Sequence, residues 1–231
     1  MTRVLTIFTL LGFVCAADVA AAADNALTDA QKKDGWINLF DGKTLDGWAV
    51  KSGYATYKVE DGAIVGTTAK GSPNSFLTSD TEYGDFELTF DVLLDSNPLN
   101  SGVQIRSKLV GDKYGGRLSG PQCEIEAGPG QAGYIYGEAL GTGWLSPEPN
   151  SKDKAVNQHE HFQNGEWNAY RIIAKGDNIQ TWINGQMIAD LTLPEKVAAT
   201  HKEGYLGLQV HGVGKSGPYT VRWKNIYLKK R

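Results

Sequence analysis

The segment FELTFDVLL, residues 86–94, decides the fold class of this chain. Its apolar residues at 86, 88, 90, 92 and 94 alternate with Glu87, Thr89 and Asp91. Successive side chains of a β-strand point to opposite faces of a sheet, so this alternation predicts a strand with one face in a core and the other at a surface. The segment therefore indicates a sheet that is covered by a core on one side only.

Similar segments precede and follow this strand. We predict one hairpin over residues 57–67, turning at Asp61-Gly62, and a second over residues 167–190, turning at Gly176-Asp177 and Asn184-Gly185. Asn-Gly and Asp-Gly supply the positive φ angles that two-residue hairpin turns need. Further strands are predicted at residues 102–107, 122–127, 205–211 and 219–228, and short helices only at 28–33 and 195–201. Short strands spread over the whole chain predict one all-β sandwich domain.

Composition and charge indicate a globular protein and argue against one class of function. The chain has 231 residues, of which 41% are hydrophobic, so a sizeable core is available. It carries 23 Lys and Arg against 26 Asp and Glu, and its longest basic run is Lys229-Lys230-Arg231. Because phosphate neutralisation needs clustered Lys and Arg, these numbers argue against a dedicated nucleic-acid binder.

The first 23 residues resemble a secretory signal peptide. A basic start at Arg3 precedes an apolar run over residues 4–17, and Ala21-Ala22-Ala23 offers the small residues of a cleavage site. The run is shorter than the roughly 20 residues of a membrane-spanning helix, so a permanent anchor is the weaker interpretation. We expect cleavage near Ala23 and a periplasmic or secreted protein without membrane attachment. A linker over residues 24–34 and a domain over residues 35–231 would follow.

Signal cleavage would also remove Cys15 and leave Cys123 as the only cysteine. A mature chain with one cysteine has no internal disulfide, so its stability must come from its core. We expect Cys123 to be a small buried residue rather than a nucleophile.

Three predicted strands each have an apolar face and an unusually polar face. They lie at residues 102–107, 122–127 and 205–211. The polar positions are Gln104, Arg106, Gln122, Glu124, Glu126, Gln209 and His211. If the strands are neighbours, these side chains form a polar floor, rimmed by the aromatic residues Trp48, Tyr136 and Trp144. Amides and guanidinium groups bind pairs of hydroxyls, and flat aromatic rings cover C–H faces. We therefore predict a carbohydrate site on this floor.

The chemistry of the floor leaves alternatives open. Glu124 and Glu126 are two residues apart on a strand, so their Cα atoms lie about 6.5–7 Å apart, a spacing compatible with paired-carboxylate glycosidase chemistry. It is equally compatible with one carboxylate holding Arg106 and the other facing water. His211 is either a catalytic or a structural histidine. His159-Glu160-His161, in the long unpatterned stretch over residues 137–164, is either a metal site or exposed loop.

Four blocks of sequence resemble the 3-keto-disaccharide hydrolase domain family. They are WINLFDGKTLDGW (residues 36–48), NSGVQIR (100–106), the Trp167-Asn168 hairpin with its Asn184-Gly185 turn, and GLQVH (207–211). The resemblance extends over about residues 35–228. It implies a jelly-roll β-sandwich of the concanavalin A-like lectin and glucanase type. It also implies cleavage of glycosides that have been oxidised to a ketone at C3.

The resemblance further implies roles for individual residues. A C3 ketone acidifies the C2 proton, so a base can form an enediolate that expels the C1 substituent, and water then adds. His211 would be the base or a metal ligand, Arg106 would bind the ketone or enolate oxygen, and Glu124 and Glu138 would be acids. A divalent ion on His211 and Glu124 is an optional electrophile. The substrate would be held by the polar residues Asn100, Gln104, Gln122 and Gln209 and the aromatic residues Trp48, Tyr136 and Trp144.

Two other functions are compatible with the sequence. A lectin-like binding module would use the same amides and aromatic rings without cutting its ligand. An endo-glucanase of the same fold is less favoured, because such enzymes carry Glu-x-Asp-x-x-Glu on one strand. Here Glu124-Ile125-Glu126 is followed by Ala127, Gly128 and Pro129, so the third acid is missing.

Overall fold

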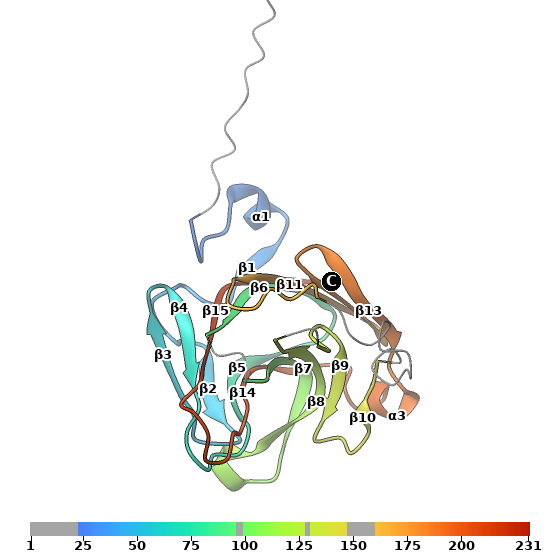
Figure 1. Ribbon diagram of the computed structural model, residues 1–231. Coiled ribbons are helices and arrows are strands. Elements are labelled where there is room, and N and C mark those ends of the chain that lie inside the picture. Colours follow the sequence, from blue (N-terminus) through green and yellow to red (C-terminus); the bar gives the residue numbers. More distant parts are fainter. Residues whose placement is uncertain (1–22, 96–98, 128–129, 147–159) are drawn as a thin grey trace, which may run out of the picture.

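The computed structural model describes residues 23–95, 99–127, 130–146 and 160–231. These residues form two antiparallel sheets that pack face to face as a jelly-roll β-sandwich (Figure 1). The helices are short: α1 (Asp29–Lys33), the 3-10 turn η1 (Lys113–Gly115) and α3 (Glu195–Ala198). No helix among the described residues is both long and apolar enough to span a membrane. The predicted all-β sandwich is confirmed.

The first sheet has the strand order β13-β12-β11-β6-β15-β4-β3, and β1 pairs with β15. Its strands are β1 (Trp36–Asn38), β3 (Thr56–Glu60), β4 (Ala63–Thr67), β6 (Phe86–Leu94), β11 (Asn168–Lys175), β12 (Asn178–Ile183), β13 (Gln186–Thr192) and β15 (Thr220–Lys230). The alternating segment at residues 86–94 therefore forms the central strand β6, between β11 and β15. The structure confirms both predicted hairpins, and their Asp-Gly and Asn-Gly turns have positive φ at both residues.

The second sheet has the strand order β10-β9-β8-β7-β14-β5-β2. Its strands are β2 (Trp48–Lys51), β5 (Ser75–Tyr83), β7 (Ser101–Val110), β8 (Arg117–Ile125), β9 (Ile135–Glu138), β10 (Gly143–Trp144) and β14 (Gly204–Val210). Strands β2, β5, β9 and β10 were not predicted. The three polar-faced strands, β8, β7 and β14, are consecutive in this sheet, as a common polar floor requires.

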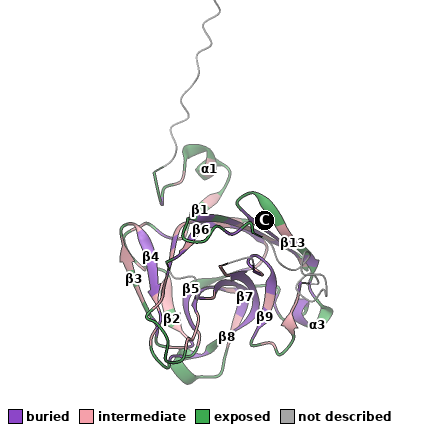
Figure 2. Ribbon diagram, viewed as in Figure 1, coloured by how far each residue is buried: buried purple, intermediate pink, exposed green. Residues whose placement is uncertain are grey.

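The core lies between the two sheets and is built from the alternating apolar positions. Phe86, Leu88 and Phe90 of β6 are at most 1% exposed, as are Val103 and Ile105 of β7. Figure 2 shows buried residues along β4, β5, β7 and β9, whereas α1 is exposed. Cys123 is also fully buried in this core, and desolvation raises its thiol pKa well above the usual value. The prediction that Cys123 is a buried residue is thus confirmed.

Arg106 departs from the predicted polar face because β7 contains a bulge. The register between β7 and β8 shifts between Gln104 and Lys108, and Arg106 has φ of 48°. A bulge inserts an extra residue and turns the following side chains. Arg106 is consequently 1% exposed and donates to the carbonyls of Gly84 and Gly176, at 2.8 and 2.6 Å. Its guanidinium also pairs with Asp85 at 2.7 Å, away from the predicted floor.

Replacing Arg106 with Ala should destabilise the fold without affecting the floor. The substitution leaves two turn carbonyls and a carboxylate without their buried donor, which we expect to cost about 3 kcal/mol of unfolding free energy. Urea unfolding measures this cost. The matched control, Lys108→Ala, removes the exposed pair with Glu82 and should cost less than about 1 kcal/mol. Equal costs for the two variants would contradict this structural role.

The segment expected as a linker, residues 24–34, packs against the sandwich. The Asn25 backbone N–H donates to Asn225 Oδ1 at 2.6 Å, and its side chain donates to the Gly62 carbonyl at 2.8 Å. Thr28 caps α1 through Gln31, which accounts for the predicted helix there. The predicted signal peptide lies outside the described residues except for Ala23, as does His159. Secretion and the extracellular location stay predictions.

Candidate functional site

The polar floor lies on the side of the second sheet that faces away from the core. Gln104 is paired with Gln122, and Gly102 with Glu124, so both partners of each pair project to the same side. Position 102 needs a glycine for steric reasons, because a Cβ there would lie 2.7 Å from the Gln122 side chain. The missing side chain thus leaves room for Gln122 to lie across β7.

A cavity of about 350 Å³ opens over this floor. Its lining residues are Asn74, Asn100, Gln122, Glu124, Glu126, Tyr136, Glu138, Trp144, Gln209 and His211. Eight of the eleven side chains predicted for the site therefore lie together. We call this cavity the polar pocket. Its size is within the range of small-molecule sites.

Glu124 is at the centre of the hydrogen bonds beneath the polar pocket. Gln122 Nε2 donates to its Oε1 at 2.6 Å, and Asn100 Nδ2 donates to its Oε2 at 3.1 Å. Gln209 Nε2 in turn donates to Gln122 Oε1 at 3.1 Å. Amides from β8, from β14 and from the residue preceding β7 thus hold the carboxyl group in place.

Burial keeps the Glu124 carboxyl group protonated at neutral pH. Glu124 is 4% exposed, and desolvation raises its pKa from 4.5 to about 8. The amides of Gln122 and Asn100 lower this pKa less than burial raises it, and the charges of Glu126 and Glu138 raise it further. A neutral carboxylic acid in a pocket is a proton donor.

Because the pKa of Glu124 is raised, the free energy of unfolding should fall as the pH rises. Below pH 4.5 Glu124 is protonated in both the folded and the unfolded chain. Between pH 4.5 and about 8 only the unfolded chain loses this proton, and the loss favours unfolding. The contribution is on the order of 1.4 kcal/mol per pH unit across this window. Urea unfolding from pH 5 to 8 should show the decline, and Glu124→Gln should be flatter. Parallel curves for the two proteins would contradict the raised pKa.

Gln209 contributes a buried acceptor without a partner. Its Oε1 has no hydrogen bond within the described ranges, although the residue is fully buried. Buried polar atoms are nearly always satisfied, so an orphan in a pocket wall indicates where a ligand donor fits. A sugar hydroxyl is such a donor.

His211 lies at the partly exposed side of the polar pocket, directly after β14. Its Nδ1 is 2.9 Å from the Gly212 carbonyl, and a carbonyl only accepts hydrogen bonds. Nδ1 therefore carries the proton, and Nε2 of the neutral ring has a lone pair available for a proton or a ligand.

Asn74 and Arg117 support the wall of the pocket and were missed by the sequence reasoning. Asn74 accepts from the Gly212 backbone N–H at 2.9 Å, which fixes the turn beside His211. Arg117 pairs with Glu138 at 2.9 Å. Asn74 precedes β5 and Arg117 begins β8, where no alternation marks a side chain as functional.

Three predicted site residues do not line the polar pocket. Arg106 is displaced by the bulge described above. Gln104 lies on the floor but is fully buried, and its Oε1 accepts from Ser107. Trp48 is on β2, at the opposite edge of the sheet from β9 and β10, and its indole N–H donates to the Leu39 carbonyl at 2.8 Å. The predictions that these residues line a common site are therefore wrong.

The remaining aromatic residues form one wall. Tyr136 of β9 and Trp144 of β10 are paired across the two strands, and their ring centroids lie 5.3 Å apart at an angle of 78°. Their position beside Glu138 and Gln122 puts apolar surface next to hydrogen-bonding groups. Sugar rings need both kinds of surface.

The donor set does not fit the proposed ion on Glu124 and His211. Both Glu124 oxygens already accept amide hydrogen bonds, and the carboxyl group is neutral near pH 7. Among the described residues, no three His, Cys, Asp or Glu side chains lie close enough together to hold a metal ion. A metal requirement stays a prediction, which an assay with and without EDTA tests.

Comparisons with known proteins agree with this fold. A glycosyl hydrolase candidate from Parabacteroides distasonis has a TM-score of 0.64 at 22% identity, over 90% of this chain and 100% of that chain. A second from the same organism has a TM-score of 0.55 at 21% identity, over 85% and 99%. The carbohydrate binding module CBM66 from Bacillus subtilis has a TM-score of 0.56 at 15% identity, over 80% and 96%. No curated protein matches the chain.

The sequence profile of the 3-keto-alpha-glucoside-1,2-lyase-like domain matches residues 35–229. This range covers every residue of the polar pocket and both sheets except Lys230, the last residue of β15. The chain therefore belongs to the family of 3-keto-alpha-glucoside-1,2-lyase-like domains.

Proposed function

We propose that the chain is an enzyme that cleaves glycosides carrying a ketone at C3, and that the reaction takes place in the polar pocket. Family membership indicates the substrate class. The pocket supplies the two proton-transfer groups that the reaction needs, together with amides and aromatic rings for the sugar. The reaction begins by elimination and ends by hydration.

In the first step, the Nε2 lone pair of His211 takes the C2 proton. The electrons of the C–H bond move toward C3, and the C3 ketone becomes an enolate. The C1–O bond then breaks as a C1=C2 bond forms, and Glu124 gives its proton to the departing oxygen. Addition of water to the resulting unsaturated 3-keto sugar gives the hydrolysis product.

One observation supports this assignment above the others. The polar pocket combines a carboxyl group with a pKa of about 8 with a histidine whose Nε2 is free to accept a proton. Elimination needs one group of each kind, an acid and a base.

The test is release of the leaving group from a 3-keto-glucoside by the purified protein, assayed with and without EDTA. We expect release in untreated enzyme and formation of the unsaturated 3-keto sugar before hydration. Loss of activity with EDTA and its recovery with added Mg²⁺ or Mn²⁺ would establish the metal requirement. No release under any metal condition would contradict the proposal.

A lectin-like module is the second candidate, because the unpartnered Gln209 acceptor and the Tyr136–Trp144 wall serve binding as well as catalysis. The likeness to a carbohydrate binding module extends over most of the chain. Calorimetry separates the candidates: saturable binding of a 3-keto-glucoside that is recovered unchanged would favour the module.

A further inference from the structure

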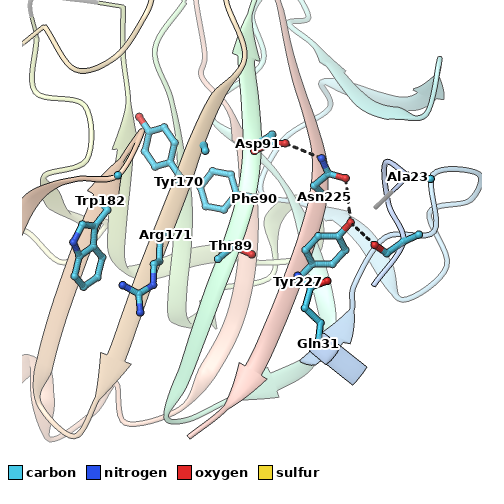
Figure 3. Close-up of a pocket in the computed structure, with 13 residues that line it drawn as sticks. Ala23, Gln31, Thr89, Phe90, Asp91, Tyr170, Arg171, Trp182, Asn225 and Tyr227 are labelled. Atoms are coloured by element: carbon cyan, nitrogen blue, oxygen red, sulfur yellow. Dashed lines mark hydrogen bonds between the residues drawn. The ribbon is translucent and has the colours of Figure 1, made fainter. Parts of the chain in front are cut away.

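A second hollow, of about 500 Å³, lies on the other side of the molecule from the polar pocket. It opens over the first sheet, on the face of β6, β11 and β15 that points away from the core, and the segment containing α1 forms one of its walls (Figure 3). We call it the outer hollow. None of its lining residues belongs to the polar pocket, so the reaction proposed above does not use it.

The outer hollow exists because small residues alternate with large ones across neighbouring strands. Thr89 lies between Arg171 and Tyr227, which are its partners on β11 and β15. Arg171 is in turn paired with Trp182 on β12. Figure 3 shows Arg171 and Trp182 on one side of the hollow and Tyr227 on the other, with Thr89 between them. Ala169, paired with Asp91, extends this low floor by one more position.

One side of the outer hollow presents hydrogen-bond donors with no protein partner. Arg171 Nε donates to Glu87 at 2.6 Å, and the guanidinium carbon lies 4.5 Å from the centroid of the Trp182 ring. These two contacts hold the guanidinium group in place. Its two Nη atoms have no acceptor within the part of the chain that the structure describes. Two parallel N–H donors in a rigid plane bind pairs of oxygen atoms.

The other side presents an acceptor. Asn225 Nδ2 donates to Asp91 Oδ2 at 2.7 Å, and Asp91 Oδ1 accepts no hydrogen bond from any described residue. Arg171 and Asp91 are diagonal neighbours on adjacent strands, a relation that separates Cα atoms by about 7–8 Å. They nevertheless form no ion pair among the described contacts. The two groups thus stand on either side of the same floor.

We propose that the outer hollow is a second carbohydrate-binding site, which holds an uncharged sugar unit between Arg171, Asp91 and Trp182. A hydroxyl group donates to Asp91 and accepts from Arg171, and the low floor of Thr89 and Ala169 admits the C–H face of the ring. An anionic ligand is disfavoured because the Asp91 carboxylate lines the hollow. Glu87 divides its charge between Arg171 and Arg231. The volume is within the range of small-ligand sites.

Protein-observed NMR with unoxidised oligosaccharides tests this site without depending on catalysis. The probes are maltotriose, cellotriose and N,N′-diacetylchitobiose, each titrated to millimolar concentration. We expect saturable shifts of the Thr89 and Arg171 amides and the Trp182 indole N–H for at least one probe. Absence of such shifts for all three sugars would overturn the proposal. A charged tripeptide is titrated as a control, and shifts that it alone produces would also overturn the proposal.

A filling variant locates the binding. Thr89→Tyr puts a ring into the outer hollow while keeping a residue type that strands favour. We expect it to weaken binding at least tenfold. Thr56→Tyr, at an exposed position of β3 in the same sheet, is the matched control and should bind like the unmodified protein. Neither variant touches the polar pocket, so both should keep full turnover of a small 3-keto-glucoside. Unchanged affinity in Thr89→Tyr would overturn the proposal even if the enzyme is active.

Discussion

Glu124→Gln should lower the turnover of a 3-keto-glucoside with an alkyl leaving group by about 10²- to 10⁴-fold, the usual contribution of a positioned general acid. The amide has the same shape, but it has no proton to give. Its NH2 group only donates, so Asn100 must turn its side-chain oxygen toward it to keep the contact. Steady-state kinetics of both proteins at pH 7 measure the effect.

The choice of leaving group separates proton donation from a structural role. A 3-keto-glucoside of an acidic phenol expels a stable anion, so it needs little protonation, and Glu124→Gln should cleave it at close to the normal rate. An equally large loss with both substrates would mean that the substitution disturbs the pocket and not the proton transfer.

The same carboxyl group sets an upper limit on the working pH. In the unmodified enzyme, kcat with an alkyl leaving group should decline above about pH 8, because Glu124 then loses its proton. With the phenol substrate this decline should be absent. A decline of the same size for both substrates would assign it to another group.

His211→Ala should reduce turnover by a comparable factor with every substrate, because proton removal from C2 precedes departure of any leaving group. The fold should be retained, since the ring is partly exposed and its one described hydrogen bond is to the adjacent Gly212 carbonyl. Circular dichroism and thermal unfolding check this. His161→Ala, at an exposed position outside the polar pocket, is the matched control and should be fully active.

Two further measurements identify His211 as the base. Deuterium at C2 of the substrate should slow the unmodified enzyme if proton removal limits the rate, and added imidazole should restore part of the activity of His211→Ala. Full activity of the variant would remove His211 from the mechanism. The search for the base would then move to Glu126 and Glu138, the carboxyl groups that line the pocket beside Glu124.

Local rules of backbone and side-chain geometry explain what was predictable. The alternation in β6 is a property of any strand with one buried face, and Asp61-Gly62 and Asn184-Gly185 meet the dihedral needs of their turns. The same alternation placed Gln122 and Glu124 on one side of β8, where the structure has them. These inferences use only residues close together in sequence.

The all-β class, the family and most of the polar pocket could be inferred from the order of the residues alone. Folding was needed to reveal that Arg106 leaves the floor, that Trp48 lies at the far edge of the sheet, and that Asn74 and Arg117 support the wall. Bulges, strand order and loop contacts depend on partners distant in the chain, so no local pattern predicts them. The pKa of Glu124 has the same origin, since burial is a property of the assembled sheets and not of any segment.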